Sequence, residues 1–371
     1  MRRIAPEVRD WDAAIGLAAA HGAAGILAGS LIRSGALEEL PEPARRSLGR
    51  LRRAAIFVFE NQVAMLGEVR SRFERAGVPF VLLKGLGLAE RLYEDSSDRM
   101  GIDVDVLVRE EDLRKAGEQL EAMGFRPAHP DHYRARHFHI PYYPVGNRYH
   151  FAVEVHWEVT PATSPVQFRA RDWLGSARPV ELRCGPVLLP GKADEIAHVA
   201  WHAFAAGSPR LRDLRDAALL WEAHRDAEER ASTAARAADA GAGLFLRETL
   251  ELGAALWGEG AGQGPDPGPA AIPSRRWIAR KLLEPSPVVR READRWWPYG
   301  KILYWSLLRG PEAGILFLFR ESIRGEKDAA RIRGGRFGWR ETARALAEML
   351  AALAVSLGPG RARRGTRSSA R

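Results

Sequence analysis

The sequence predicts an α+β protein in which a mixed β-sheet with flanking helices is preceded and followed by helical regions. Two stretches, residues 9–75 and 192–257, repeat their apolar residues at helical spacing. Between them, short apolar runs of β type alternate with helical stretches and turn signals. The composition, 46% hydrophobic and 28% charged, is typical of a folded chain and excludes a fully disordered or fibrous one.

The first element is an N-terminal helical region, which we assign to residues 1–76. Helical periodicity runs through residues 11–28, and a long amphipathic pattern follows over residues 44–76. The pattern stops at Gly77 and Pro79, residue types that interrupt helices. This change marks the boundary with the next region.

The predicted core spans residues 77–190 and begins with two strands, each followed by a helix. The apolar run at residues 80–83 is the first strand, and a helical stretch at residues 88–93 follows it. Residues 102–108 form the second strand, with Ile102 expected to face the core. A helix then runs from about residue 111 to 123.

The rest of the core, from residue 125 onward, contains strand patterns. Residues 149–159 alternate between two faces with great regularity, and Glu154 and His156 share the polar face. A turn signal at residues 144–147 directly precedes this run, so we expect the return strand of a hairpin. Residues 182–189 are a further strand candidate.

After the core, four regions follow in order. We expect a helical subdomain packing on the core at residues 191–257, a linker rich in glycine and proline at 258–274, a basic helical region at 275–357 and a disordered tail at 358–371. The net charge of +9 is unevenly spread, because residues 271–371 alone carry +13. This basic region is therefore where we expect any weak contact with RNA or a membrane surface.

Composition also excludes several classes of protein. The chain has one cysteine, Cys184, which excludes an intramolecular disulfide framework and any site built from several cysteines. No run approaches the roughly 18 consecutive apolar residues of a membrane-spanning helix, and charged residues interrupt the N-terminus where a signal peptide would be apolar. We expect a cytoplasmic protein without a transmembrane segment.

The candidate catalytic and binding residues lie near the first two predicted strands, just after the first strand and early in the second. Asp103 and Asp105 are two positions apart in a strand, so both side chains project from one face. Neighbouring carboxylates repel one another unless a cation lies between them, and Mg²⁺ prefers such oxygen ligands. Gly85 opens a helix whose free N–H groups favour a phosphate, and Glu154 is placed to complete the metal site. The pattern predicts a site for Mg²⁺ and a triphosphate.

The order of strand, glycine, helix, arginine, acidic strand and helix resembles the core of the polymerase-beta-like nucleotidyltransferase superfamily. The motifs LLKGxxLAxxLY, DxDVLV, VEVHW and RLRDLRDAALL are similar to those of the bacterial uncharacterised nucleotidyltransferase family (group 5 NTP-transferase domain), over about residues 50–225. This resemblance implies that an NTP donates a nucleoside monophosphate to a hydroxyl acceptor, with Mg²⁺ (or Mn²⁺) and release of pyrophosphate.

The resemblance also implies roles for individual residues. Asp103 and Asp105 match the metal-binding acid pair, and Glu154 matches the third acid, which binds metal and deprotonates or orients the acceptor hydroxyl. Gly85 takes the place of the glycine that grips the nucleotide. The usual serine after this glycine is replaced by leucine, so we expect Lys84 to supply the phosphate contact. Arg99, just before the acidic strand, is a further candidate phosphate ligand.

Other residues have weaker signals. We expect His156, His202 and Asp216 near the acceptor pocket, although Asp213 and Asp216 also fit helix-face charges paired with the arginines beside them. An alternative is a metal cluster made from the histidines of residues 129–156, whose spacing fits no compact motif: His129, His132, His137, His139, His150 and His156.

Two alternative functions stay open at this point. The chain also fits a non-catalytic nucleotide-binding or scaffold protein, although three converging acids would have no purpose there. The Lys84-Gly85 pair resembles nucleotidyltransferase toxins that modify RNA. The sequence names neither the NTP nor the acceptor, which is a small molecule, an RNA or a protein.

Overall fold

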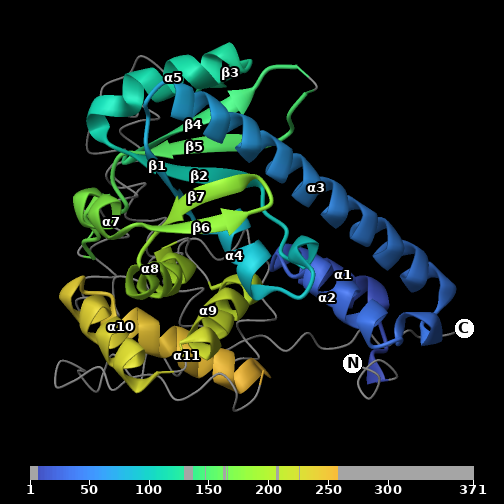
Figure 1. Cartoon of the computed structure of the whole chain (residues 1–371). Helices are drawn as coiled ribbons and strands as arrows, with labels where there is room; N and C mark the ends of the chain where they lie inside the picture. Colours follow the sequence, from blue (N-terminus) through green and yellow to red (C-terminus); the bar gives the residue numbers. More distant parts are fainter. Residues whose placement is uncertain are drawn as a thin grey trace, which may run out of the picture.

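The computed structural model describes residues 7–128, 137–146, 148–161, 164, 166–205, 209–224 and 226–257 (Figure 1). The predictions for the linker, the basic C-terminal region, the tail, His129 and His132 all lie outside these residues. The described part is a mixed α+β fold built on one seven-stranded sheet. Among its helices, none combines the length and the hydropathy that crossing a bilayer needs.

Three helices precede the sheet: α1 (Trp11–Ala20), α2 (Ala24–Arg33) and α3 (Glu42–Arg75). The Asp10 side chain caps α1 by accepting the backbone N–H of Ala13 at 2.9 Å. The helical periodicity of residues 11–28 is divided between α1 and α2, because Gly22 adopts a φ of +65° between them. The 34 residues of α3 form one uninterrupted helix, as its amphipathic pattern predicts.

The strands are β1 (Phe80–Leu83), β2 (Asp103–Val108), β3 (Phe125–Pro127), β4 (His139–Pro144), β5 (Ala152–His156), β6 (Arg178–Leu182) and β7 (Gly185–Leu189). Their order across the sheet is β3-β4-β5-β2-β1-β7-β6. The pairs β2–β5 and β1–β7 are parallel and the other pairs are antiparallel, which confirms a mixed sheet. The sheet places β2, with its acids, at its centre.

Alternation along β2 gives the sheet two different faces. Val104, Val106 and Val108 are buried on the face covered by α3 and α5 (Leu113–Ala122). Asp103, Asp105 and Leu107 project from the opposite face, where Leu107 joins the core formed with the C-terminal helices. The acids therefore lie between the sheet and the second helical layer.

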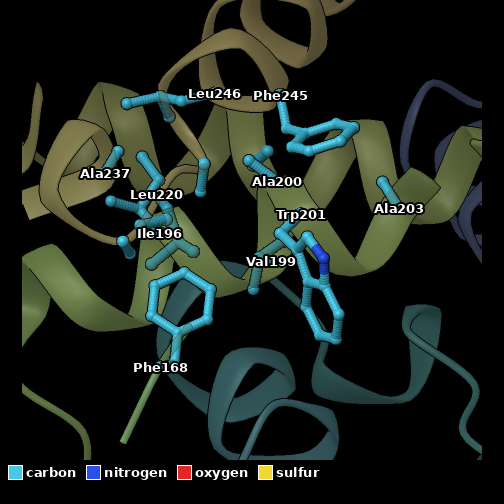
Figure 2. Close-up of a cluster of buried hydrophobic side chains, with 14 of the residues drawn as sticks. Phe168, Ile196, Val199, Ala200, Trp201, Ala203, Leu220, Ala237, Phe245 and Leu246 are labelled. Carbon is cyan, nitrogen blue, oxygen red and sulfur yellow. The ribbon is translucent and has the colours of Figure 1, made fainter. Parts of the chain in front are cut away.

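That second layer consists of α7 (Ala170–Ser176), α8 (Lys192–Ala205), α9 (Leu211–Ala223), α10 (Ala227–Asp239) and α11 (Gly243–Trp257). Figure 2 shows Phe168, Ile196 and Leu220 in its apolar core, with Phe245 of α11 above α8. Val81 and Leu83 of β1 belong to the same core, so these helices are fixed against the sheet. The described parts of residues 192–257 are mostly helical, in the four helices α8 to α11, as their periodicity predicts.

The remaining elements are α4 (Gly85–Leu92) and short 3₁₀ turns at Leu37–Glu39, Ser96–Asp98 and Glu110–Asp112. Three details differ from the sequence prediction. Ile102 precedes β2 and is 72% exposed rather than facing the core, because the alternating pleat begins only at Asp103. Residues 182–189 belong to two strands, since Gly185 at φ +97° lets the chain reverse between β6 and β7. The run at residues 149–159 forms a strand only over Ala152–His156.

Candidate active site

The three predicted acids meet at the centre of the sheet. Asp105 of β2 lies directly opposite Glu154 of the parallel strand β5, and Asp103 is two residues earlier on the same face. Each offers a carboxylate oxygen, and these oxygens all lie within 4.8 Å of one another. Asp105 is buried, whereas Asp103 and Glu154 are partly accessible. The donor set consists of hard oxygen ligands, which suits a divalent cation such as Mg²⁺.

Lys84 reaches the same point from the end of β1. Its Nζ lies 3.2 Å from Asp105 Oδ2 and donates to His202 Nε2, also at 3.2 Å. Among the described residues it is the one non-glycine with a positive φ, at 40°. An L-residue is strained in such a conformation, which persists only where the surroundings fix it. The turn from β1 into α4 therefore holds the Lys84 ammonium against the acids.

The two members of the acid pair differ in their electrostatics. Burial, together with the charge of Asp105, raises the pKa of Asp103 to about 6. Burial alone would also raise the pKa of Asp105, but the Lys84 charge and a hydrogen bond from His156 hold it well below its usual range. Neighbouring carboxylates need a positive charge beside them, and the chain itself supplies one. Lys84 already neutralises one of them.

Two histidines lie beside the acids on the same face. His156 Nε2 donates to Asp105 Oδ1 at 3.0 Å and lies 3.6 Å from Glu154 Oε2. His139 Nε2, from β4, lies 3.7 Å from the same Glu154 oxygen. The His139 and His156 rings stack with their centroids 4.8 Å apart. Burial and the neighbouring His156 lower the pKa of His139 to about 4, so this ring is neutral at physiological pH.

The two histidines of α8 have different surroundings. His198 is buried against Trp173, with ring centroids 5.0 Å apart, and belongs to the packing of the helical layer. His202 lies one turn later and contacts Lys84. Burial and the Lys84 charge lower the pKa of His202 to about 3, so the ring is neutral. Its Nε2 therefore accepts a hydrogen bond from the Lys84 ammonium.

Arg99 and Asp216 form a buried ion pair that joins the segment preceding β2 to α9. Arg99 donates to Asp216 through Nε at 3.0 Å and through Nη2 at 2.7 Å. Tyr93 donates its hydroxyl to Asp216 Oδ1 at 2.7 Å. The expectation that Asp216 pairs with the arginines beside it is wrong, whereas Asp213 does pair with Arg212, at 3.1 Å. The long-range pair fixes α9 beside the acids.

These groups line one cavity of about 280 Å³. Its wall includes the acids Asp103, Asp105 and Glu154 together with Lys84, Gly85, Arg99, His139, His202, Arg210, Arg212 and Asp216. His156 is buried beside Asp105 and Glu154 and is not part of this wall. Arg210 is exposed at the rim. A cluster of carboxylates thus faces a cationic rim across a small space, an arrangement that fits a cation bound together with an anionic ligand.

Comparison with known protein families decides the identity of this domain. The model of the family described as uncharacterised nucleotidyltransferase matches residues 7–258. The chain belongs to this family. The match confirms the family resemblance and extends it beyond residues 50–225 to all of the described helices.

Solved structures give weaker similarities to this nucleotidyltransferase. The solution structure of the antibiotic-resistance factor ANT(2'')-Ia is 15% identical, with a TM-score of 0.34, and covers 47% of this chain and 90% of its own. The crystal structure of an antigenic nucleotidyltransferase-like protein from Paracoccidioides brasiliensis is 14% identical, with a TM-score of 0.31. The match covers 48% of this chain and 87% of that protein. No protein with a curated description matches the chain.

Several residues of this nucleotidyltransferase site lack a clear sequence signal. Arg210 and Arg212 lie in an arginine-rich stretch where nothing distinguishes a cavity residue from a solvated charge. His139 is one of many histidines in residues 129–156, and only the antiparallel register of β4 on β5 places it opposite His156. A strand pairing prediction would have found His139, but no local pattern would have found the arginines.

Proposed function

We propose that this nucleotidyltransferase transfers a nucleoside monophosphate from an NTP to an acceptor hydroxyl, with metal-dependent release of pyrophosphate. The observation that carries the proposal is the pairing of Asp105 with Glu154 across two parallel strands, with Asp103 on the same face. Three acids in one cavity with a lysine and a helix start provide both a cation site and an anion site. A protein that only binds nucleotides has no need for the third acid.

The residues present fit a divalent metal ion. Asp103, Asp105 and Glu154 offer carboxylate oxygens within 4.8 Å of one another, and all three line the cavity. Mg²⁺ or Mn²⁺ bound there would neutralise triphosphate charge and stabilise the attacking and leaving oxygens. The chain itself prepares the site, because His156 and Lys84 hold Asp105 ionised and fixed in place.

Lys84 and the start of α4 are the proposed phosphate ligands. Gly85 begins α4 with a φ of +46°, and its missing side chain leaves the backbone open to the cavity. Free N–H groups at a helix start favour an anion, and the Lys84 ammonium adds a point charge beside them. Asp216 occupies Nε and Nη2 of Arg99, so Nη1 is the atom we assign to a phosphate contact.

Glu154 is the proposed acceptor-side acid. Its carboxylate is partly accessible and lies between Asp105 on β2 and His139 on β4. From this position it accepts the proton of an incoming hydroxyl, or orients that hydroxyl, as the oxygen attacks the α-phosphate. His156 and His202 lie next to the reacting groups and position Asp105 and Lys84 respectively. Asp216 positions Arg99 in the same way.

Transfer of label from each α-³²P-labelled NTP tests the proposal. The full chain is incubated with Mg²⁺ or Mn²⁺ and with small-molecule, RNA and protein extracts as separate acceptors. We expect one acceptor class to become labelled, and we expect Asp103→Asn to abolish labelling. Asp239→Asn, which changes an exposed aspartate on α10, is the matched control and should label normally. If NTP binds but no acceptor is labelled and no pyrophosphate appears, the chain is a non-catalytic nucleotide-binding protein.

A further inference from the structure

A second group of metal-binding side chains lies beside the acids. It consists of His139 from β4 and of Glu154 and His156 from β5. Antiparallel pairing places His139 directly opposite His156, and Figure 1 shows β4 and β5 side by side. Each residue offers one ligand atom, and these atoms lie within 4.8 Å of one another. This group differs from the acid set in having two imidazole nitrogens.

Two of the three spacings between these atoms are close to those of a tetrahedral site. Glu154 Oε2 lies 3.6 Å from His156 Nε2 and 3.7 Å from His139 Nε2. Ligands bonded to zinc at about 2.0–2.1 Å are separated by roughly 3.3–3.4 Å at tetrahedral angles. For these two distances, the shifts required are only a few tenths of an ångström. The two rings also stack, at an interplanar angle of 29°.

We propose that His139, Glu154 and His156 form a binding site for a transition-metal ion of the zinc class, next to the Mg²⁺ site. Imidazole nitrogens are ligands for zinc, cobalt and similar ions, whereas Mg²⁺ prefers oxygen ligands alone. Two histidines and one glutamate are a known ligand set for zinc with an open fourth position. Asp105 Oδ1, 3.0 Å from His156 Nε2, is an additional oxygen beside the group.

Access and charge both favour a cation here. His139 and Glu154 line the cavity, so an ion can reach them, while His156 forms the buried end of the group. Three carboxylates, Asp103, Asp105 and Glu154, face one lysine, Lys84, within this small region. A bound ion would take the place of the proton that His156 now shares with Asp105.

Glu154 belongs to both groups, and this has a consequence for the neighbouring site. An ion held by the histidines removes one oxygen from the acid set, so binding of the two ions is antagonistic. The histidine site itself does not depend on nucleotidyl transfer, because its ligands are tested by metal binding alone. Failure of the proposed function and failure of this proposal can therefore be told apart.

Titration of the metal-free full chain with Co²⁺, without nucleotide or Mg²⁺, tests the site. Co²⁺ with nitrogen ligands in a four-coordinate site absorbs visible light much more strongly than Co²⁺ held by oxygens in a six-coordinate site. We expect the strong spectrum in wild type and in Asp103→Asn. His139→Gln should lose it and bind Co²⁺ at least about tenfold more weakly, since even the loss of an outer-shell partner costs this much. His150→Gln, at an exposed position on the approach to β5, is the matched control.

Two results would overturn the proposal. One is equal Co²⁺ affinity in wild type and His139→Gln, and the other is loss of binding in Asp103→Asn with binding kept in His139→Gln. A second measurement on the unmodified chain covers the case in which His139→Gln fails to fold. Zn²⁺ should protect His139 from diethyl pyrocarbonate, read by peptide mass spectrometry, whereas Mg²⁺ should not. Equal protection by both ions, or by neither, would also refute the site.

Discussion

Replacing the two aspartates of β2 one at a time should have opposite effects on stability in the absence of metal. Asp103 has its pKa raised to about 6 by burial and by the neighbouring Asp105 charge. An aspartate in the unfolded chain has a pKa of about 4, and a pKa difference of one corresponds to about 1.4 kcal/mol. Ionised Asp103 therefore destabilises the fold by up to about 3 kcal/mol. Asp103→Asn removes that charge without changing the size of the side chain.

The sign follows from the direction of the shift. The folded state holds the Asp103 proton more tightly than the unfolded state, so wild-type stability falls as the pH rises from about 4 through about 6. Asp103→Asn lacks this loss. We expect its free energy of unfolding to match wild type near pH 4 and to exceed it by about 1–3 kcal/mol at pH 8.

Asp105→Asn should do the reverse. Asp105 is 2% exposed and is paired with Lys84 and His156, and removing one partner of a buried ion pair costs about 3–5 kcal/mol. The pKa of Asp105 lies well below its usual range, so this contribution is present above about pH 4 and is lost only in strong acid. The double variant Lys84→Met/Asp105→Asn removes the uncompensated lysine and should recover part of the loss.

Urea unfolding in EDTA at pH 4, 6 and 8 measures both effects, with Asp239→Asn as a neutral control. If Asp103→Asn and Asp105→Asn destabilise equally at pH 8, the asymmetry that Lys84 creates is absent in solution. The same conclusion would follow if the difference in free energy of unfolding between Asp103→Asn and wild type did not change with pH.

Three further predictions concern binding. Mn²⁺ affinity should fall about tenfold per pH unit below about 6, because a proton competes for Asp103, and calorimetry showing a flat affinity between pH 5 and 7 would contradict this. Lys84→Met should weaken NTP binding by about tenfold or more through loss of a phosphate charge, and equal affinity in a filter assay would remove Lys84 from the phosphate site. Residues 358–371 carry five arginines and no acid, so their deletion should weaken any RNA binding and reduce its dependence on salt concentration. NTP binding should stay unchanged. Equal RNA affinities of the full and shortened chains would favour a small-molecule or protein acceptor.

Much of the site follows from local pattern. Side chains in a strand point to opposite sides in turn. The two-residue spacing of Asp103 and Asp105 therefore predicts that both lie on one face, and the alternation around Glu154 predicts that it lies on the polar face of its strand. The strand–glycine–helix order located Lys84 and Gly85 at a junction. These features depend on a few consecutive residues, which is why the sequence alone predicts them.

The contacts that give the site its chemistry depend on pairing over long distances in the chain. The ion pair of Lys84 with Asp105 requires β1 to lie antiparallel to β2, and that of Arg99 with Asp216 joins residues 117 positions apart. Neither can be deduced from periodicity. The error at Ile102 has a local cause, since a strand boundary misplaced by one residue assigns a side chain to the wrong environment.

The central claim is that the acids of β2 and β5 promote transfer of a nucleoside monophosphate. The most direct measurement compares two labels on the same NTP, at the α- and the γ-phosphate, in reactions with the full chain, Mg²⁺ and the acceptor fraction that becomes labelled. We predict that the α-label moves to the acceptor, that the γ-label leaves as pyrophosphate, and that Glu154→Gln stops both. Label moving from the γ-position to the acceptor, or α-label transfer that survives Asp103→Asn and Glu154→Gln, would contradict the account.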